Sequence, residues 1–293
     1  MNLFVFGLGY SALHFVRRYR DRFARIAGTS RSAARSEALA SEGIVGRIFA
    51  PGIVEPSIAD DLREATHLLV SVPPDEEGDP ALAAFGEAIA SSRRLGWIGY
   101  LSTIGVYGDR GGAWIEESTP PAPGNERSLQ RLAAEKAWLD LGRRSGKTTA
   151  IFRLAGIYGP GRNALVKLRG GRARRIVKPG QVFNRIHVED IAAVLAASIE
   201  RPRAGAVYNL ADDEPAPPQD VTAYAAALGG IEPPPAIPFE EAALAPMAAS
   251  FYAENRRVAN RLIKDELGVR LAYPTYREGL RTLHEAGEGT AHS

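Results

Sequence analysis

The stretch Asn2-Leu-Phe-Val-Phe-Gly-Leu-Gly-Tyr-Ser-Ala-Leu-His14 decides the fold of this chain. Residues 3–6 form a short apolar run with high β-propensity, and Gly7-x-Gly9-x-x-Ala12 follows at once, ahead of a helix-like pattern. A glycine-rich turn between a buried strand and the N-terminus of a helix is typical of a site for dinucleotide phosphates. An ordinary glycine turn is the alternative, but the position directly after the first strand favours dinucleotide binding.

Each small residue of this turn has a physical reason. Gly7 permits the tight turn, Gly9 lets the backbone approach a pyrophosphate, and Ala12 still allows a helix to pack closely on a strand. The helix N-terminus then offers N–H groups and the positive end of its dipole to the phosphates. The residues that we predict to contact the cofactor here are Gly7, Leu8, Gly9, Tyr10, Ser11 and Ala12.

The composition limits the remaining possibilities. The chain has 293 residues, of which 45% are hydrophobic and 24% charged, as in ordinary soluble globular proteins. A formal net charge of only +2 gives no general indication of a nucleic-acid or membrane surface. The absence of cysteine excludes disulfides, thiolate metal sites and a cysteine nucleophile, and we expect no metal site. With no apolar run near 18 residues and no signal-like start, we expect a soluble cytoplasmic protein.

The second predicted strand, residues 25–29, leads into Ser30-Arg31. In folds of this type the residue about 20 positions after the glycines lies over the adenosine ribose, and an NAD site places Asp or Glu there. This chain has no acidic residue between that strand and Glu37. A carboxylate would repel a 2′-phosphate, whereas a guanidinium can bind it with two charge-assisted hydrogen bonds. We therefore expect NADP(H) rather than NAD(H), with Ser30 and Arg31 as contacts; otherwise Arg31 is a solvated loop residue.

Strands and helices alternate along the first half of the chain and return near residue 188. This order predicts an α/β fold: a Rossmann-type doubly wound parallel sheet with right-handed crossovers and a small C-terminal substrate-binding lobe. In a parallel sheet the carboxyl ends of the strands line the ligand crevice, so Ser71, Val72 and Pro73 should flank the cofactor. The predicted strands are residues 3–6, 25–29, 45–49, 67–72, 97–102, 148–154 and 206–210, and the predicted helices are residues 11–20, 34–42, 57–63, 80–94, 127–144 and 188–200.

The regular alternation weakens in the second half of the chain. We assign residues 1–154 and about 188–210 to a dinucleotide-binding domain. Residues 155–187 and 211–286 would form a small lobe that caps the sheet and makes the substrate pocket between the lobes. The last residues, 287–293, are expected to be a frayed tail.

Five further motifs follow the glycine turn in order, and the whole set spans residues 2 to about 215. They are Leu101-Ser-Thr-Ile-Gly-Val-Tyr-Gly108, Glu116-Glu-Ser-Thr-Pro120, Arg153-Leu-Ala-Gly-Ile-Tyr-Gly-Pro-Gly161, Arg185-Ile-His-Val-Glu-Asp-Ile191 and Tyr208-Asn-Leu-Ala-Asp212. With the glycine turn, this set resembles the extended short-chain dehydrogenase/reductase family, the nucleotide-sugar epimerases and dehydratases. The resemblance implies further cofactor contacts, at Leu101, Ser102, Arg131, Gly156 and Tyr158. Many members of the family dimerise through two long helices, here residues 80–94 and 127–144, so a homodimer is considered.

The chain departs from the family at its catalytic pair. Family members carry Tyr-x-x-x-Lys on the helix after the 97–102 strand, and the lysine lowers the pKa of the tyrosine that transfers the proton. None of the ten tyrosines here has lysine four residues later. Aligning Leu132-Ala-Ala-Glu135 with the family's Leu-x-x-Glu places Arg127 at the tyrosine position and Arg131 at the lysine position. Arginine stays protonated near neutral pH, so the usual proton relay is missing, although Arg131 can supply charge and bind a ribose.

Three hydroxyl groups remain as candidates for catalysis, those of Ser102, Thr103 and Tyr107. Thr103 occupies the family's catalytic hydroxyl position, four residues before Tyr107, and could hydrogen-bond a substrate carbonyl or hydroxyl. Tyr107 is the nearest tyrosine that could replace the missing acid; the simpler interpretation is that it packs at the base of the loop. Dehydratases carry Asp-Glu directly after this threonine, whereas this chain has Ile104-Gly105, so a nucleotide-sugar 4,6-dehydratase is not expected.

The small lobe contains candidate substrate contacts. The basic run Arg169-Gly-Gly-Arg-Ala-Arg-Arg175 is either a solvated loop or a surface for a pyrophosphate or carboxylate, with Arg172 as the contact. Asn184 and Arg185 are further candidates, because the family often places a substrate-binding arginine in this segment. Nucleic-acid binding is the weaker alternative, since no aromatic residues interleave with the basic ones. His187 lies in an apolar run and fits a hydrogen-bonded core residue better than a metal ligand.

Two functions fit these observations. The first is an NADP(H)-dependent oxidoreductase or nucleotide-sugar epimerase-like enzyme on a polar, anionic small molecule, with hydride exchange between cofactor and substrate. The second is a non-catalytic NADP(H)-binding sensor or scaffold, which the missing catalytic pair favours. Oxidation of bound NADPH would distinguish the two.

Overall fold

The computed structural model of the chain describes residues 1–289, apart from the side chain of Met247. The chain folds as two compact units. The first contains Met1–Val106, Asn125–Arg153 and Ile191–Tyr208, and the second contains Tyr107–Gly124, Leu154–Asp190 and the residues from Asn209 onward. Residues 107–124, which we assigned to the dinucleotide-binding domain, lie in the second unit, where Trp114 and Ile115 pair with Arg257 and Val258.

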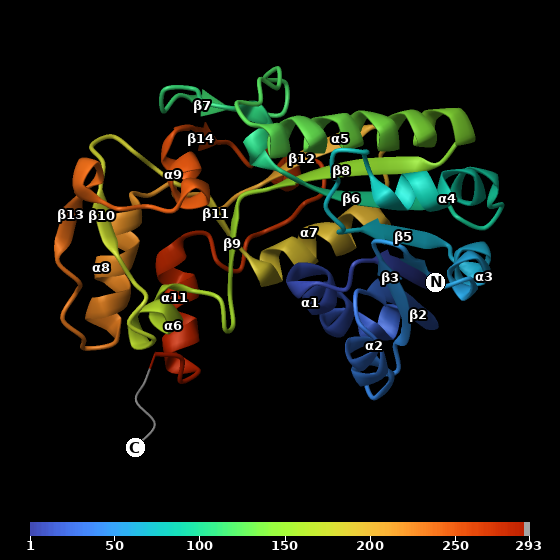
Figure 1. Cartoon of the computed structure of the whole chain (residues 1–293), viewed down its shortest axis with the longest axis horizontal. Coiled ribbons are helices and arrows are strands. Elements are labelled where there is room, and N and C mark those ends of the chain that lie inside the picture. Colours follow the sequence, from blue (N-terminus) through green and yellow to red (C-terminus); the bar gives the residue numbers. More distant parts are fainter. Residues whose placement is uncertain (290–293) are drawn as a thin grey trace. The chain divides into compact units, whose positions relative to one another are not determined.

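An eight-stranded sheet forms the centre of the first unit (Figure 1). Its strand order is β12-β8-β6-β5-β1-β2-β3-β4, so the chain winds outward from β1 in both directions. The pairs β1–β2, β1–β5, β2–β3 and β5–β6 are parallel, and β3–β4 is antiparallel. This order confirms the predicted α/β, doubly wound fold. The strands are β1 (Asn2–Phe6), β2 (Arg25–Ser30), β3 (Val45–Ala50), β4 (Ile53–Val54), β5 (His67–Val70), β6 (Trp97–Thr103), β8 (Thr148–Leu154) and β12 (Ala206–Leu210).

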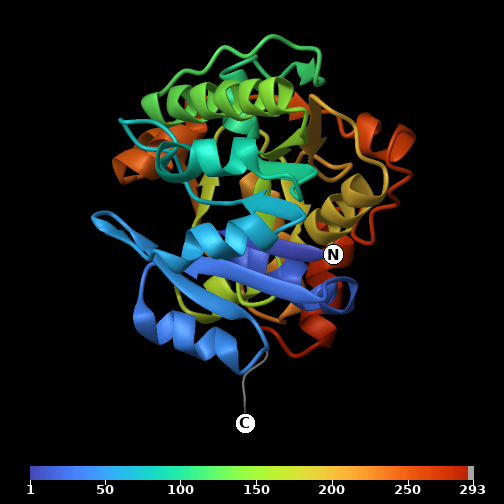
Figure 2. The same cartoon turned by 90° about the vertical axis from the view of Figure 1, so that its right-hand side faces the viewer.

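Helices cover both faces of this sheet. Phe4 and Phe6 of β1 face a buried cluster that includes side chains of α3, α4 and α5. On the opposite face, an aromatic series joins α1 to β12, with ring centroids 6.0 to 6.4 Å apart: Phe15, Phe23, His67, Trp97, Phe152 and Tyr208. Figure 2 shows α3 above and α2 below the strands β2 and β3. The helices are α1 (Tyr10–Arg18), α2 (Ala33–Ala40), α3 (Ser57–Glu64), α4 (Pro80–Ser91), α5 (Glu126–Ser145) and α7 (Val188–Glu200).

The second unit is built from short elements. β9 (Gly156–Tyr158), which is not among the predicted strands, pairs in parallel with β11 (Arg185–His187). The remaining strands pair as β7 (Trp114–Ile115) with β14 (Arg257–Val258), and as β10 (Arg175–Val177) with β13 (Ala236–Pro238). The helices are α6 (Ala164–Arg169), α8 (Pro218–Leu228), α9 (Pro246–Tyr252), α10 (Arg261–Asp265) and α11 (Tyr276–Glu285), and side chains of α6, α8 and α11 share one buried cluster.

The C-terminal segment was expected to fray over residues 287–293. In the described part of it, the Glu288 carboxylate accepts hydrogen bonds from the Gly161 N–H (2.8 Å) and from the Asn163 side chain. Residues 290–293 lie outside the described part of the chain.

A buried ion pair connects α5 to the sheet in the first unit. Arg153 of β8 binds the Glu135 carboxylate of α5 with its Nη2 (2.7 Å) and its Nε (3.1 Å), and both side chains are almost fully buried. Ser102, near the end of β6, donates to the same carboxylate at 2.5 Å. Because burying either charge without the other would be costly, the pair fixes how α5 lies on the strand ends.

We expect Gly46→Ala to destabilise the first unit. A Cβ atom at this position of β3 would lie 2.4 Å from the Ser36 carbonyl oxygen of α2, so the helix would have to move away from the sheet. The free energy of unfolding should fall by about 1–3 kcal/mol in urea denaturation. Gly96→Ala is the control, since its Cβ would meet nothing within 4 Å. Equal effects of the two substitutions would contradict this packing argument.

We expect Arg153→Met to cost about 3–5 kcal/mol of unfolding free energy, because it leaves the Glu135 carboxylate buried without its cation. The matched control is Arg143→Met, which removes an exposed ion pair with Asp140 and should cost no more than about 1 kcal/mol. Urea denaturation of both variants measures the difference. Similar losses would show that the buried pair is no more important than a surface pair.

Candidate functional site

The glycine turn at residues 7–9 is fixed from two sides. The Gly7 N–H donates to Thr29 Oγ1 (2.8 Å) and the Leu8 N–H donates to the Thr29 carbonyl oxygen (2.9 Å). Gly7 has a φ of +85°, and a Cβ atom there would lie 3.0 Å from Val72 Cγ1. Glycine is therefore required both by the backbone conformation and by the contact with the residues that follow β5. The sequence pattern did not single out Thr29, whose hydroxyl anchors the turn.

The space beside Gly9 is open. A Cβ atom on Gly9 would meet only the Gly7 carbonyl oxygen, at 4.0 Å. α1 begins at Tyr10 with Gly9 as its N-cap, no side chain caps it, and its first turn contains no acidic residue. The side chains of Leu8, Ser11 and Ala12 are buried, so these residues can offer a ligand mainly their backbone. The turn and the helix N-terminus thus have the room and the charge that a pyrophosphate needs.

The end of β2 carries arginines and no carboxylate. The hydroxyl of Ser30 is occupied, because it donates to the Ser32 carbonyl oxygen (2.9 Å) and contacts Ser36 Oγ (2.9 Å). Arg31 is exposed and has no hydrogen bond or ion pair with any of residues 1–289. Arg35 Nη2 donates to the Leu8 carbonyl oxygen at 2.9 Å, so a second guanidinium lies beside the glycine turn. We had not predicted Arg35, because its contact with Leu8 joins residues 27 positions apart in the chain.

The residues after β5 and the end of β6 meet at the Arg131 side chain. Its Nη1 donates to the carbonyl oxygens of Val72 (3.3 Å) and Leu101 (3.0 Å) and to the Tyr100 hydroxyl (3.0 Å). Burial raises the pKa of Tyr100, so this phenol stays neutral. Arg131 Nε and Nη2 make no hydrogen bond with any described residue. Ser71 and Pro73 lie on the same segment after β5, half-buried and exposed respectively.

Ser102 and Thr103, at the end of β6, differ in what they can offer a substrate. Ser102 is buried and its hydroxyl donates to Glu135, so it serves the ion pair described above. The half-buried Thr103 uses its Oγ1 as an acceptor for the Gly105 N–H (3.0 Å), which leaves its own hydroxyl proton for another partner. Of these two predicted catalytic residues, only Thr103 has a hydroxyl proton to donate.

Tyr107, the predicted acid, is buried and hydrogen-bonded within the second unit. Its ring is fully buried in the second unit, and its hydroxyl donates to Asn209 Oδ1 at 2.8 Å. A phenol that is buried and hydrogen-bonded in this way is not exposed to a substrate. This placement favours the simpler interpretation, in which Tyr107 packs at the base of its loop, and the role as an acid stays a prediction.

The second unit contains the other predicted cofactor contacts. The Gly156 N–H donates to the Asn184 carbonyl oxygen (3.0 Å) between β9 and β11. Tyr158 is buried, its ring centroid lies 5.0 Å from that of His187, and burial raises the pKa of its phenol. His187 Nδ1 accepts from the Glu189 N–H (3.2 Å), and its ring also contacts Tyr273. These contacts are those of a hydrogen-bonded core histidine.

The predicted substrate contacts also belong to the second unit. Asn184 is buried, donates to the Arg256 carbonyl oxygen (2.9 Å) and accepts from the Val258 N–H (2.8 Å). The amide nitrogen and the amide oxygen of Asn184 therefore both bind the backbone at β14, and its role as a substrate contact stays a prediction. Arg185 is half-buried and uses its Nη1 on two carbonyl oxygens. Arg172 is exposed and makes no ion pair in the part of the chain that is described.

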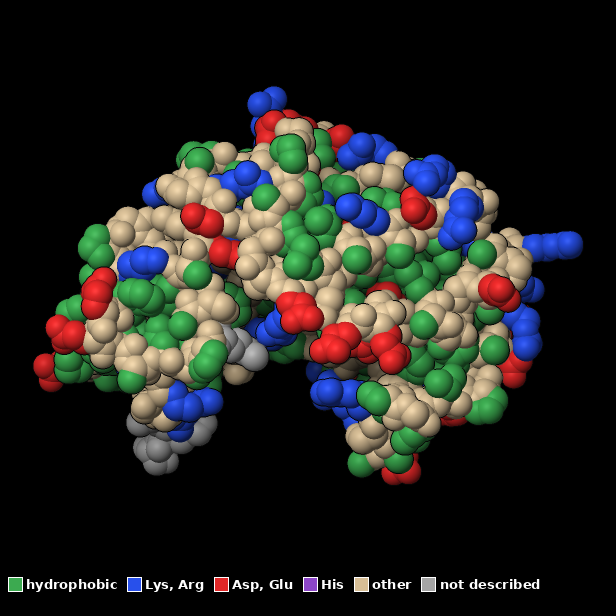
Figure 3. Space-filling model, turned by 45° about the horizontal axis from the view of Figure 1, so that its top comes forward, with side chains coloured by type: hydrophobic (Ala, Val, Ile, Leu, Met, Phe, Trp, Pro, Cys, Tyr) green, Lys and Arg blue, Asp and Glu red, His purple; other side chains and the backbone are tan. Residues whose placement is uncertain are grey.

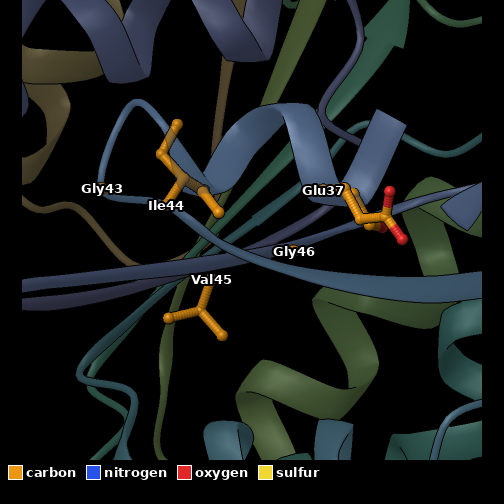
Figure 4. A pocket seen from close by; sticks show the side chains of 7 residues that line it. Glu37, Gly43, Ile44, Val45 and Gly46 are labelled. Atoms are coloured by element: carbon orange, nitrogen blue, oxygen red, sulfur yellow. The ribbon is translucent and has the colours of Figure 1, made fainter. Parts of the chain in front are cut away.

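A shallow pocket lies between the end of α2 and the start of β3 (Figure 4). Glu37, Gly43, Ile44, Val45 and Gly46 contribute to its lining. It opens at the amino end of β3, whereas the glycine turn lies at the carboxyl edge of the sheet, so it is not part of the dinucleotide site. Among residues 1–289 no cluster of three metal-ligating side chains occurs, and no helix is long and apolar enough to span a membrane.

Part of the chain matches the model of a known family. The model of the NAD dependent epimerase/dehydratase family matches residues 87–211. The chain is 28% identical to the protein YeeZ of Escherichia coli (strain K12) over 245 residues, which cover 78% of this chain and 84% of that protein. This match includes more than the segment that the family model covers.

Solved structures extend the similarity over the whole chain. A functionally unknown conserved protein from Silicibacter pomeroyi DSS is 52% identical, with a TM-score of 0.89 over 98% of this chain and 99% of that one. A dTDP-glucose 4,6-dehydratase from Bacillus anthracis str. Ames, solved in complex with NAD, has the same fold at 16% identity, with a TM-score of 0.77 over 98% and 97% of the two chains. Residues 87–211 thus match the NAD dependent epimerase/dehydratase family, and the whole chain has the fold of the Bacillus anthracis dehydratase.

Proposed function

We propose that this protein is a cytoplasmic, NADP(H)-dependent oxidoreductase or epimerase-like enzyme that acts on a polar, anionic small molecule. The observation that carries the proposal is the glycine turn at residues 7–9, which has open space beside Gly9 and no acidic side chain in the first turn of α1. On this proposal the first unit holds the cofactor, and the second unit supplies substrate contacts.

The preference for NADP(H) rests on the charges at the end of β2. A 2′-phosphate needs cations and no carboxylate, and this place has Arg31 without a partner and Arg35 beside the turn. The family is described by its NAD dependence, and the Bacillus anthracis dehydratase was solved with NAD. Selectivity for NADP(H) would therefore be a property of this chain and its near relatives.

The nicotinamide, when bound, would donate or accept a hydride at a substrate carbon. Thr103 would donate its hydroxyl proton to a substrate oxygen, because its Oγ1 already accepts from Gly105. Arg131 would bind the ribose with Nε and Nη2 while its Nη1 stays on the strand ends. The accompanying proton would come from water or from the substrate itself, since arginine does not exchange protons near neutral pH.

The anionic character of the substrate is inferred from the second unit. Arg185 and Arg172 are cations there that no acidic side chain of the described residues holds in an ion pair. Guanidinium groups bind pyrophosphates and carboxylates well. The Bacillus anthracis relative is named for a nucleotide sugar, which is one compound of this class.

A non-catalytic NADP(H)-binding sensor or scaffold is the second candidate. Two of the three predicted catalytic hydroxyl groups favour it, because those of Ser102 and Tyr107 are buried and already donate hydrogen bonds within the protein. Only Thr103 keeps a hydroxyl proton for a substrate. A protein that binds NADPH tightly and never oxidises it with any carbonyl or nucleotide-sugar compound would support this candidate.

We expect NADPH to bind more tightly than NADH, and Arg31→Ala to weaken NADPH about 10- to 100-fold. The reason is the loss of about 1.4–2.8 kcal/mol of charge-assisted contact with the 2′-phosphate. NADH, which lacks that phosphate, should be affected little. Fluorescence and calorimetric titrations with NADPH, NADH, NADP and NAD measure these affinities.

The control for this titration is Arg94→Ala, which removes an exposed arginine paired with Glu64. It should leave all four affinities unchanged. Equal affinity for NADPH and NADH would overturn the proposed preference, and failure to bind any dinucleotide would overturn both candidate functions.

We also propose that the protein forms a homodimer through α4 and α5. A groove between these helices is lined mainly by small and apolar residues, including Leu82, Gly86, Ala90 and Ala137. Charged residues of both signs, Glu87 of α4 and Arg144 of α5 among them, also line it. Figure 3 shows hydrophobic side chains exposed between charged ones on this part of the surface. Small residues let helices of two copies approach closely, and opposite charges suit a two-fold contact.

We expect Ala84→Arg, on the exposed side of α4 in this groove, to convert the dimer into a monomer. A long charged side chain there would separate the helices of the two copies. Sedimentation equilibrium of the wild type and the variant measures the change. Ala38→Arg, the same change on the exposed face of α2, should remain dimeric. A monomeric wild type would contradict the proposed dimer.

A further inference from the structure

Asp212 is a buried carboxyl group for which the proposed chemistry has no use. It follows β12 in the second unit, and only 1% of its surface is exposed. Its Oδ1 accepts from the Glu214 N–H (3.2 Å), whereas its Oδ2 accepts no hydrogen bond from any described residue. Burying a carboxylate oxygen without a donor is costly, so this environment favours the protonated, neutral carboxyl group.

Arg185 is the cation that acts most strongly on Asp212. The two residues are joined by a hydrogen bond from the Asp212 N–H to the Arg185 carbonyl oxygen (2.6 Å), and each is the main charged neighbour of the other. Arg185 Nη1 donates to the carbonyl oxygens of Phe183 (2.9 Å) and Ala216 (3.1 Å). Its Nε and Nη2 make no hydrogen bond with any described residue, and the side chain is only half-buried. These two donors can therefore bind an anion.

The two acidic residues that follow Asp212 in the chain already have partners of opposite sign. Asp213 pairs with Lys264 of α10 at 2.5 Å, and Glu214 pairs with Arg277 of α11. Neither acid is therefore available to neutralise Arg185 fully. The charge that faces an incoming anion is set mainly by Arg185 and by the state of Asp212.

The tyrosines beside the pair stay neutral. Burial raises the pKa of Tyr158 in β9, which also faces Asp190 and Glu278, and it raises the pKa of Tyr276 in α11. Burial also raises the pKa of Asp212 to about 8, and the Arg185 cation opposes this rise. Burial lowers the pKa of Arg185, but a guanidinium remains protonated near neutral pH. Asp212 is thus the group of this cluster that changes charge near pH 8.

We propose that Arg185 is an anion-binding residue whose strength is set by the proton on Asp212. With the proton on Oδ2, the Arg185 cation is uncompensated, and Nε and Nη2 bind an anionic group of the ligand. Without it, the Asp212 carboxylate neutralises Arg185 and competes with the ligand. The inference rests on the proposed function in one respect, that the natural ligand is the anionic substrate. The coupling between the Asp212 proton and anion binding can be tested with an inorganic anion.

The direction of the coupling follows from linkage. An anion that binds better when Asp212 is protonated must raise the pKa of Asp212 further and must bind more weakly as the pH rises through about 8. At pH 9 about one tenth of the Asp212 groups would keep their proton, so the affinity should be about 10-fold lower than at pH 6.5.

Sulfate is a suitable probe, because its charge does not change between pH 6.5 and 9. We expect calorimetry to show about 10-fold weaker sulfate binding to the wild type at pH 9 than at pH 6.5. Asp212→Asn, which is neutral at both values, should bind at pH 9 as tightly as the wild type binds at pH 6.5. Arg185→Gln should lose the pH-dependent binding altogether. A wild type without pH dependence, or an Asp212→Asn variant that keeps it, overturns the proposal.

A second measurement uses only the wild type and so does not depend on whether a variant folds. In the wild type labelled with ¹³C at the aspartate carboxyl carbons, one resonance should titrate near pH 8, and sulfate should move its midpoint upward. A spectrum in which sulfate moves no such midpoint contradicts the coupling. Dinucleotide titration separates this test from the proposed function. If sulfate binding depends on Asp212 but no dinucleotide binds, only the proposed function is refuted. If a dinucleotide binds but sulfate binding does not depend on Asp212, only the role of Asp212 is refuted.

Discussion

The close contact between Gly7 and Val72 is the constraint on which the first unit depends. Gly7 has positive φ, and a side chain there would lie 3.0 Å from Val72 Cγ1, while its N–H and that of Leu8 are bound to Thr29 of β2. The turn is therefore held between β2 and β5, and α1 must begin where these strands end. The open space beside Gly9 and the cation Arg131 on the strand ends both follow from this arrangement. The proposed phosphate site would thus be a consequence of how the sheet is packed.

The sequence predicted the central sheet well, because the signals that define its elements are local. α4 begins at Pro80 after Asp79, whose side chain caps two N–H groups, and α5 ends at Gly146 with a φ of +68°. Such caps act within one helical turn, and strand alternation acts within one strand. The predicted bounds of these helices and strands consequently differ from the structure by only a few residues. The doubly wound class followed from their order.

The chemistry of the site was harder to predict, because hydrogen-bond partners lie far apart in the chain. Tyr107 donates to Asn209, 102 residues away, and Ser102 donates to Glu135, 33 residues away. A motif shows that a hydroxyl group is present, but only the fold shows whether it is already occupied. The same reason explains why residues 156–158 were not predicted as a strand, since β9 pairs with β11, nearly 30 residues later in the chain. Arg35 was missed because its contact with Leu8 crosses from α2 to the glycine turn.

Arginine in place of the family's lysine changes which tasks the site can perform. Lysine next to a tyrosine binds the ribose and also tunes a proton donor, whereas Arg131 can only bind, because it keeps its charge at any ordinary pH. Its Nη1 donates hydrogen bonds to three oxygen atoms, so the position of this positive charge is fixed as well. The charge that Arg131 would offer a ribose is then independent of pH. A pH dependence of function would have to arise elsewhere, for example in the substrate, in water, in the buried Asp79 carboxyl group or in the second unit, where burial raises the pKa of Asp212 to about 8 beside a cation.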